Sequence, residues 1–468
     1  MIYARPALHQ EAERGRDCWE GADRTGEDVR QVCEAILPDE EIERLWRQWG
    51  GSERQRKLPL GMLVRAMVMA AGTPGGAYQA DILRSYVEVE VPRVARSAFS
   101  RWLDAPREPC MTALADRALA YARAPPLALT GMLGEVKDWS SVDSTTVQVR
   151  NALQAEFPGP GADAALKGHT VLSGGCGAPV HDHVRPAREP DRRPLQLDAS
   201  WQGCGLLADL ASASLARRRA CQAHRVRCVI RLKDTWQPTV DSSARGHVTR
   251  ELCPGTDLDG LLDEELLPRD GRAIDAAGRV GSPKDPRQLR LVGVHTPKGD
   301  GFCRTNLPPR TGPRPVADRY RIRWAVELRI RWDNSVHRLD PIDAERPCSV
   351  KTRLHASRIA AMIAALLAHT HHVGTRPPRE DAPRTEAPLP PRRLALQLAV
   401  SCQAMAQAFA RTGKAAKRRW QQSADVLTHA GRDPTWRRRP SIVDPLRGWK
   451  RQPGVRTQVS RDKLKAAA

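Results

Sequence analysis

Three carboxylates stand out in this sequence because of the short motifs that surround them. Asp143 lies in SSVDSTTVQV, Asp209 follows the apolar run GLLA, and Glu327 lies in the basic, aromatic segment YRIRWAVELRIRW. Carboxylates that converge on one point repel each other, and a bound divalent cation is the usual resolution. Two such cations roughly 3.5–4 Å apart can activate a nucleophile and stabilise the leaving oxygen of a phosphodiester. The three acids therefore predict metal-dependent phosphodiester chemistry.

The segment around Glu327 predicts a helix with a polar stripe. At ~100° per residue, one side of this helix carries Tyr320, Arg323, Glu327, Arg331 and Asn334. An acid among cations is also a common pattern on solvated helices with i,i+4 ion pairs, and that interpretation stays open for this segment alone.

The elements expected around the first two acids are strands. Asp143 lies among β-branched residues that favour a strand, and Asp209 lies between a short apolar strand and a helical run, ASASLARRRACQAH. A further strand, VRCVIRLKD, follows that run. A strand, acid, helix, strand order is typical of α/β folds, whose active sites collect at strand ends.

Taken together, these motifs resemble a DDE transposase of the insertion-sequence-four family. The matching stretches are DSTTV at Asp143, LLAD at Asp209, VIRLKD ending at Asp234, TNLP from Thr305, and YRIRWAVE. The resemblance implies a ribonuclease-H-like α/β catalytic core with a β-strand insertion, preceded by an all-helical N-terminal domain and followed by C-terminal helices. It also implies cut-and-paste transposition of a bacterial insertion sequence, by cleavage and strand transfer of DNA.

The resemblance assigns roles to individual residues. Asp143, Asp209 and Glu327 are the expected catalytic residues and ligands of two Mg²⁺ ions, for which Mn²⁺ can substitute. The residues expected to bind DNA are Tyr320, Arg323, Arg331 and Asn334. The implied partners are the terminal inverted repeats and the target, both double-stranded DNA, and a second copy of the chain in a synaptic homodimer.

The sequence departs from the family pattern at two places. The family has a lysine where this chain has Asn334, which offers a neutral amide in place of a charge, and Arg331 is the candidate replacement. After Asp209 a Gly-Tyr pair is usual, and Leu210-Ala211-Ser212 stands here. These differences leave two alternatives open: a catalytically inactive, decayed DNA-binding protein, and a nuclease that cuts without joining.

Motif positions and composition predict five regions along the chain. They are a disordered polar N-terminus (1–34), a helical DNA-binding domain (35–130), the catalytic domain (136–373, with its β insertion at about 235–310), a Pro-rich linker (374–393), and a C-terminal helix with a basic tail (394–468).

Composition independently favours a polyanionic partner. The chain has 75 Lys and Arg against 54 Asp and Glu, a net charge of +21 and a pI near 10.1. An arginine-rich composition also arises from GC-rich coding DNA, and both causes fit. No apolar run reaches the ~20 residues that a membrane span needs. The 11 cysteines form no CxxC pair, so we expect a reducing cytoplasm. The resemblance implies that this is a bacterial cytoplasm and that the protein associates with the nucleoid.

Overall fold

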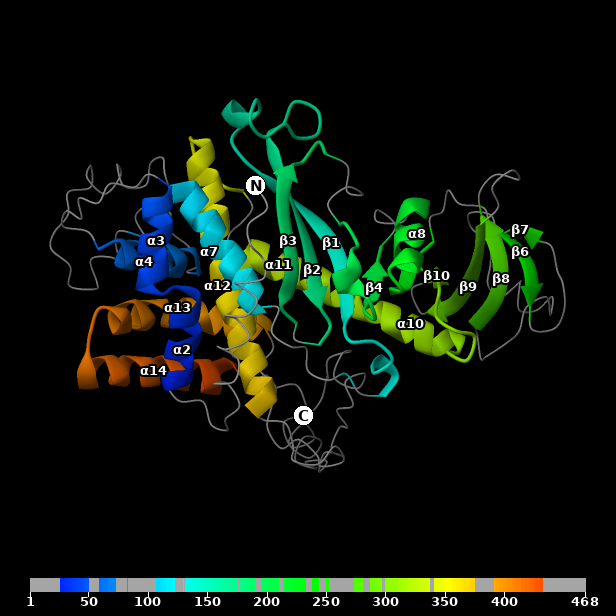
Figure 1. The fold of residues 1–468 in the computed structure, drawn as a ribbon. Helices are drawn as coiled ribbons and strands as arrows, with labels where there is room; N and C mark the ends of the chain where they lie inside the picture. Colours follow the sequence, from blue (N-terminus) through cyan, green and yellow to red (C-terminus); the bar gives the residue numbers. More distant parts are fainter. Residues whose placement is uncertain are drawn as a thin grey trace, which may run out of the picture.

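The protein is described here by a computed structural model in which a long mixed β-sheet lies beside a body of helices (Figure 1). The structure describes residues 26–49, 59–72, 82, 107–122, 129, 131–175, 177–189, 195–209, 214–232, 238–243, 250–251, 273–280, 287–296, 299–336, 341–374 and 391–431.

The centre of the sheet consists of five strands in the order β3-β2-β1-β4-β5. The first three form an antiparallel meander: β1 (Trp139–Gln148), β2 (Ala165–Ser173) and β3 (Pro179–Pro186). The next two, β4 (Gly205–Ala208) and β5 (Arg227–Arg231), run parallel to β1. Two short 3₁₀ turns, η3 (Asn151–Leu153) and η4 (Ala199–Trp201), lie in the connections.

Five more strands extend the sheet beyond β5. They follow in the order β10 (Gly299–Thr305), β9 (Arg287–Thr296), β8 (Ala273–Val280), β6 (Thr239–Ser243) and β7 (Arg250–Glu251). All their described pairings are antiparallel, including that of β10 with β5. The region of the predicted β insertion, about 235–310, therefore continues the central sheet as β6 to β10.

The close approach of β1 and β4 depends on a glycine. Gly205 pairs with Trp139, and a Cβ at Gly205 would lie 2.3 Å from Cε3 of that indole ring. Trp139 is fully buried, so the ring has no room to move away. The glycine before the LLAD motif thus allows β4 to pack beside β1.

Helices α8 (Leu215–Ala223), α10 (Pro313–Ile322) and α11 (Trp324–Val336) accompany the sheet. The prediction of one continuous helix from Tyr320 to Trp332 is wrong, because Arg323 separates α10 from α11. The amide of Arg323 donates to the Tyr320 carbonyl at 3.0 Å and that of Val326 to the Arg323 carbonyl at 3.2 Å. These i→i−3 bonds tighten the backbone locally and interrupt the α-helical hydrogen-bond pattern at Arg323.

The helical body combines segments from both ends of the sequence (Figure 1). A common hydrophobic core joins α2 (Gly26–Ile36), α3 (Asp39–Gln48), α4 (Leu60–Gly72), α7 (Arg107–Ala122), α12 (Pro347–Gly374), α13 (Pro391–Phe409) and α14 (Gly413–Gly431). The predicted helical domain and C-terminal helix thus share one core.

Parts of the predicted disordered N-terminus and of the predicted basic tail are helical where the structure describes them. Within the predicted polar N-terminus of 1–34, α2 buries Val29, Val32 and Cys33, spaced as one helical face. The basic sequence expected to begin a tail forms the first half of α14, whose Trp420 and Leu427 are buried. Most of the predicted linker, 375–390, lies outside the described residues, as do 432–468.

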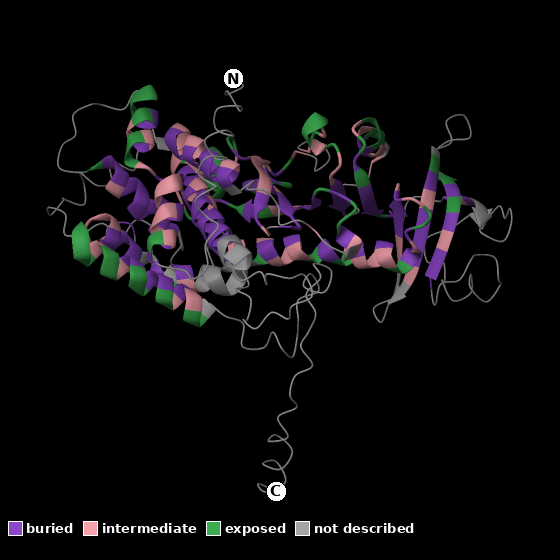
Figure 2. Ribbon diagram, turned by 60° about the horizontal axis from the view of Figure 1, so that its bottom comes forward, coloured by how far each residue is buried: buried purple, intermediate pink, exposed green. Residues whose placement is uncertain are grey.

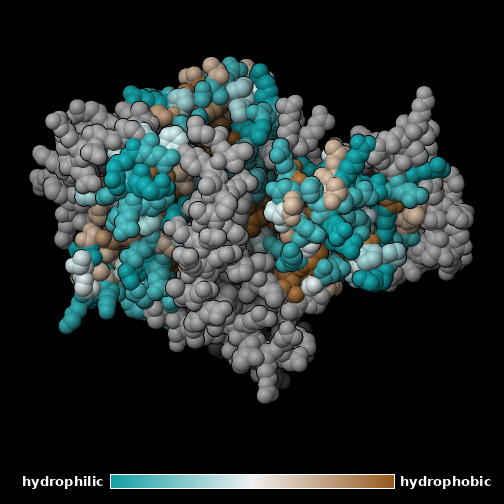
Figure 3. Space-filling model, in the orientation of Figure 1, coloured by the Kyte–Doolittle hydropathy of each residue, from teal (hydrophilic) through white to brown (hydrophobic). Residues whose placement is uncertain are grey.

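The surface separates clearly from the core. Figure 2 shows buried residues along the inner faces of the helices and exposed ones along the outer side of α14. In the view of Figure 3 the described surface is mostly hydrophilic. Within the described part of the chain, no helix combines the length and apolarity needed to cross a membrane.

Candidate active site

Asp143 and Asp209 meet because β1 and β4 are adjacent parallel strands. Val142 pairs with Ala208, so the two aspartates occupy the next position of the same register, Asp209 directly after the end of β4. In-register residues of parallel strands point to the same face. The Oδ1 atom of Asp143 accepts a hydrogen bond from the amide of Ser144 at 2.8 Å.

The α10–α11 segment brings the third acid to this place. The Tyr320 hydroxyl donates to Oδ1 of Asp209 at 3.2 Å. Arg323 forms an ion pair through Nη2 with Oε1 of Glu327, and its Nη1 lies 3.8 Å from Oδ2 of Asp143. The predicted residues Asp143, Asp209, Glu327, Tyr320 and Arg323 therefore form a single contact network.

Arg323 lies at the centre of this network and is itself buried. Its side chain is 7% exposed, against 26% for Asp143 and 21% for Glu327. The guanidinium carbon lies 5.4 Å from the centre of the Tyr320 ring. Among the described residues, neither Nε nor Nη1 has a hydrogen-bond partner. Buried N–H groups left in this way cost about 1–3 kcal/mol each, and they suit an acceptor ligand.

The acids and the arginine perturb one another electrostatically. Burial raises the pKa of the Asp143 carboxyl above its ordinary value, and the negative charges of Glu327 and Asp209 raise it further. The Ser144 amide and Arg323 oppose this rise. Burial also raises the pKa of the Tyr320 hydroxyl, so this group stays protonated and acts as a donor.

The donor set suits a divalent cation in chemistry, although the acids are not closed around one position. The hydrogen bonds described above are accepted by Oδ1 of Asp143, Oδ1 of Asp209 and Oε1 of Glu327. Oδ2 of Asp209 and Oε2 of Glu327 therefore remain for another ligand. Carboxylate oxygens are the ligands that Mg²⁺ prefers. Among the described residues, however, no three His, Cys, Asp or Glu side chains are close enough to hold a metal. Arg323 supplies positive charge between them instead.

The remaining predicted DNA-binding residues, Arg331 and Asn334, contact different neighbours of α11. The Asn334 amide donates to the Thr145 hydroxyl at 3.2 Å, so it faces β1, two residues beyond Asp143. Arg331 is exposed and lies over the ring of Trp324, with 5.5 Å from its guanidinium carbon to the ring centre. Trp324 itself is 41% exposed. Arg331 therefore packs on Trp324, whereas Asn334 packs against β1.

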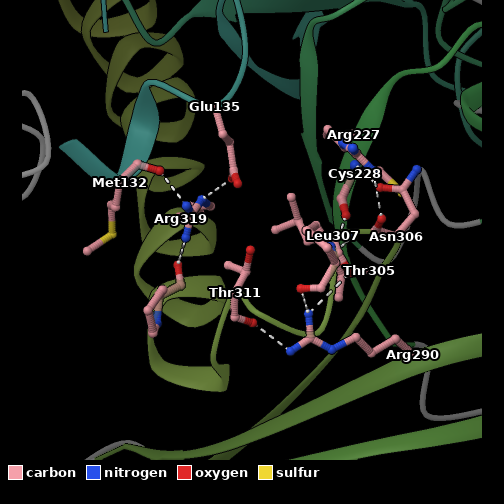
Figure 4. A network of polar contacts seen from close by, with 12 residues as sticks. Met132, Glu135, Arg227, Cys228, Arg290, Thr305, Asn306, Leu307, Thr311 and Arg319 are labelled. Carbon is pink, nitrogen blue, oxygen red and sulfur yellow. Dashed lines mark hydrogen bonds and ion pairs between the residues drawn. The ribbon is translucent and has the colours of Figure 1, made fainter. Parts of the chain in front are cut away.

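The TNLP motif positions α10 (Figure 4). The Asn306 side chain donates to the Val226 carbonyl at 2.7 Å and accepts from the Cys228 amide at 2.8 Å, which continues the pairing of β10 with β5 beyond Thr305. The Thr305 hydroxyl donates to the Cys228 carbonyl at 2.7 Å. These bonds fix the chain immediately before α10 begins at Pro313.

With the bonds of Thr305 and Asn306, two arginines form a clamp that holds α10 and the chain before it (Figure 4): Arg319 is buried, and the Arg290 side chain is 12% exposed. Arg290 on β9 pairs with Asp275 and donates to the carbonyls of Leu307, Pro308 and Thr311. On α10, Arg319 forms an ion pair with Glu135 at 2.7 Å and donates to the Met132 carbonyl in η2 (Gly131–Leu133). Both ends of α10 are thus tied to the sheet region, and this fixes where Tyr320 and Arg323 point.

A second buried ionic layer ties α11 and α12 to the meander. Arg329 pairs with Asp333 at 3.0 Å and donates to the Ala361 carbonyl of α12 at 2.9 Å. On α12, Arg358 pairs with Asp182 of β3 at 2.6 Å. Asp182 also accepts from Thr170, the residue that pairs with Asp143 across β1 and β2.

These supporting residues carried no distinct signal in the sequence. Asn306 belonged to a recognised motif, but its role as a substitute strand residue depends on a contact about 80 positions away. Arg290 and Arg319 are two arginines among many in a basic chain, and only the fold separates them from solvated ones.

One comparison with known proteins bears directly on this arrangement. Residues 136–363 match the family model described as "Transposase DDE domain", a segment that includes all three acids and covers just under half of the chain. A search of curated proteins found no match. Among solved structures, the cryo-EM structure of a piggyBac transposase synaptic complex with hairpin DNA is similar, with 10% identity, a TM-score of 0.46 and 91% of each chain covered.

Proposed function

We propose that this protein is a DDE transposase that cuts and joins DNA at the ends of a bacterial insertion sequence. The observation that carries the proposal is the contact network of Asp143, Asp209 and Glu327 through Tyr320 and Arg323, within the segment that matches the transposase DDE domain. The strand order β3-β2-β1-β4-β5, with β1, β4 and β5 parallel, supports a ribonuclease-H-like core.

In the proposed mechanism, each side chain has a separate task. Asp143, Asp209 and Glu327 would hold two Mg²⁺ ions, or Mn²⁺ in their place, which supply the charge stabilisation that phosphodiester cleavage requires. Tyr320 holds Asp209 in orientation through its hydroxyl. Arg323 has unsatisfied donors that fit two oxygens of a DNA phosphate.

The proposed substrate is double-stranded DNA carrying terminal inverted repeats, together with target DNA. The net charge of +21 supports a polyanionic partner. The first half of α14 supports this further, because it exposes the three cations Lys414, Lys417 and Arg418, which suit a polyanionic partner. We further propose a homodimer that synapses two ends in the bacterial cytoplasm.

A second candidate is a decayed DNA-binding protein without catalysis. The observation that favours it is the neutral Asn334, whose amide is engaged with Thr145 and carries no charge towards DNA. This candidate predicts DNA binding without chemistry.

One assay separates the candidates. Purified protein is incubated with Mg²⁺ and labelled duplexes that end in the repeats flanking its gene, together with a target plasmid. A transposase cleaves the ends and joins them to the plasmid, and a nuclease cleaves without joining. A remnant shifts the duplex in a gel and leaves it intact, which would contradict the proposal.

A further inference from the structure

The three acids of the candidate site already have a cation between them, the guanidinium of Arg323. It is paired with Glu327, lies 3.8 Å from Asp143, and packs on the ring of Tyr320, whose hydroxyl is bound to Asp209. Without such a charge, three nearby carboxylates would repel one another. In the free protein, Arg323 is therefore the internal counter-ion of the site.

This counter-ion is only partly satisfied where it lies. One nitrogen, Nη2, is engaged with Glu327, whereas Nε and Nη1 are buried and have no hydrogen-bond partner among the described residues. A guanidinium presents its donors as a fork that matches the oxygens of a phosphate. A phosphate would therefore satisfy donors that the carboxylates leave open.

The position of Arg323 in the backbone allows such a change. It lies at the junction of α10 and α11, where the local bonds are i→i−3. The acids are held independently of it: Asp143 by β1 and Asp209 by the end of β4. Arg323 can thus turn towards another anion while the strands keep both aspartates in place.

We propose that Arg323 couples metal binding to DNA binding: it neutralises the acids in the free protein, and a DNA phosphate draws it away from them. This inference rests on the proposed function. A cation near the carboxylates competes with a divalent metal for the same negative charge. Removing Arg323, or engaging it with phosphate, therefore strengthens metal binding, and by linkage the metal strengthens DNA binding by the same factor.

The test measures Mn²⁺ affinity by calorimetry and by electron paramagnetic resonance, with and without a duplex that ends in the repeat flanking the gene. For the unmodified protein we expect DNA to raise Mn²⁺ affinity about tenfold, within the roughly 5- to 150-fold range of coupled sites. For Arg323→Gln we expect a similarly raised affinity without DNA, and no further increase when DNA is added.

The matched control is Arg321→Gln, which removes the same charge from an exposed arginine of α10 that pairs with Asp318. It should leave Mn²⁺ affinity and its response to DNA unchanged. Arg323→Lys, which keeps the charge, should retain weak binding without DNA. Circular dichroism of each variant establishes that the fold is kept, and the response of the unmodified protein's Mn²⁺ affinity to DNA tests the inference should Arg323→Gln not fold.

Two outcomes would overturn the inference, and they differ in what they say of the function. Equal Mn²⁺ affinity in the unmodified protein, Arg323→Gln and Arg323→Lys, unchanged by DNA, refutes the coupling and leaves the proposed metal site intact. If no variant binds Mn²⁺ more tightly than Glu327→Gln does, even with DNA present, both the coupling and the proposed metal site are refuted.

Discussion

At the scale of single residues, the site is defined by buried charge. Asp143, Asp209 and Glu327 were identifiable from the sequence because each belongs to a short motif with a recognisable neighbourhood. The residues that contact them in the fold were not identifiable from the sequence. The sequence placed Arg323 one helical turn from Glu327, but it did not show that the same guanidinium also approaches Asp143 on a distant strand.

The raised pKa of Asp143 predicts a pH-dependent cost to stability. An acid whose pKa is higher in the folded state binds more protons there, so stability falls as pH rises from the unfolded pKa, about 3.9, through the folded one. In Asp143→Asn the side-chain oxygen can still accept from the Ser144 amide, but the side chain cannot ionise. We expect it to melt at a higher temperature than the unmodified protein at neutral pH.

The same argument requires the difference to disappear below a pH of about 3.9, where the aspartate is protonated in both states. Melting temperatures of the two proteins, measured from acidic to neutral pH, check this. A lower melting temperature of Asp143→Asn at neutral pH would show that the charge stabilises the fold, contrary to the account.

At the scale of elements, the sequence predicted the strands and the order of the motifs well, but it did not predict the break between two of the helices. The strand containing Asp143 and the β insertion were expected from β-branched runs and turn residues. The break between α10 and α11 was missed, because RIRWAVE has good helical periodicity throughout. Tertiary contacts at both ends of α10 override that local preference.

The clamp around the TNLP motif should be measurable as stability. Asn306→Ala removes two hydrogen bonds and leaves the Cys228 amide without an acceptor, so we expect a loss of about 2–4 kcal/mol in the free energy of unfolding. Urea denaturation measures this. Arg310→Ala, an exposed change in the same segment, should stay within about 0.5 kcal/mol. Equal, small effects of both variants would mean that Asn306 is not structural.

The basic half of α14 should bind DNA without sequence preference. Replacing Lys414, Lys417 and Arg418 by Gln should weaken binding and reduce the slope of log K against log salt by about 0.9 for each DNA phosphate that the protein no longer neutralises. Fluorescence anisotropy of a random duplex at several salt concentrations measures the slope. The control changes Arg44 and Arg47 on the acidic helix α3. A slope that falls equally in the control would contradict the assignment.

At the scale of the whole molecule, the helical body unites the two ends of the chain. The sequence separated residues 1–34, 35–130 and 394–468 because polar and Pro-rich stretches lie between the apolar runs. Local composition does not reveal that α2 and α14 pack together, with the Gly26 amide bound to Gln421 at 2.9 Å. Such long-range contacts have no local sequence signal.

This shared core predicts that the C-terminal helices are required for folding. Trp420 is 3% exposed and meets Phe409 edge to face, with ring centres 4.9 Å apart. Trp420→Ala should therefore cost about 3–5 kcal/mol of unfolding free energy. Val400→Ala, at a position of α13 that is 68% exposed, should have almost no effect. Urea denaturation showing both variants equally stable would argue against a common core.

The central claim is that three carboxylates perform DNA cleavage, and the rate of Mg²⁺-dependent end cleavage by Asp143→Asn, Asp209→Asn and Glu327→Gln tests it most directly. The control is Asp318→Asn, a partly exposed acid on α10 that pairs with Arg321. We predict that each of the three loses at least about a thousandfold in rate, roughly 4 kcal/mol, while still binding the duplex, and that the control does not. Cleavage by any of the three at the unmodified rate would contradict the account.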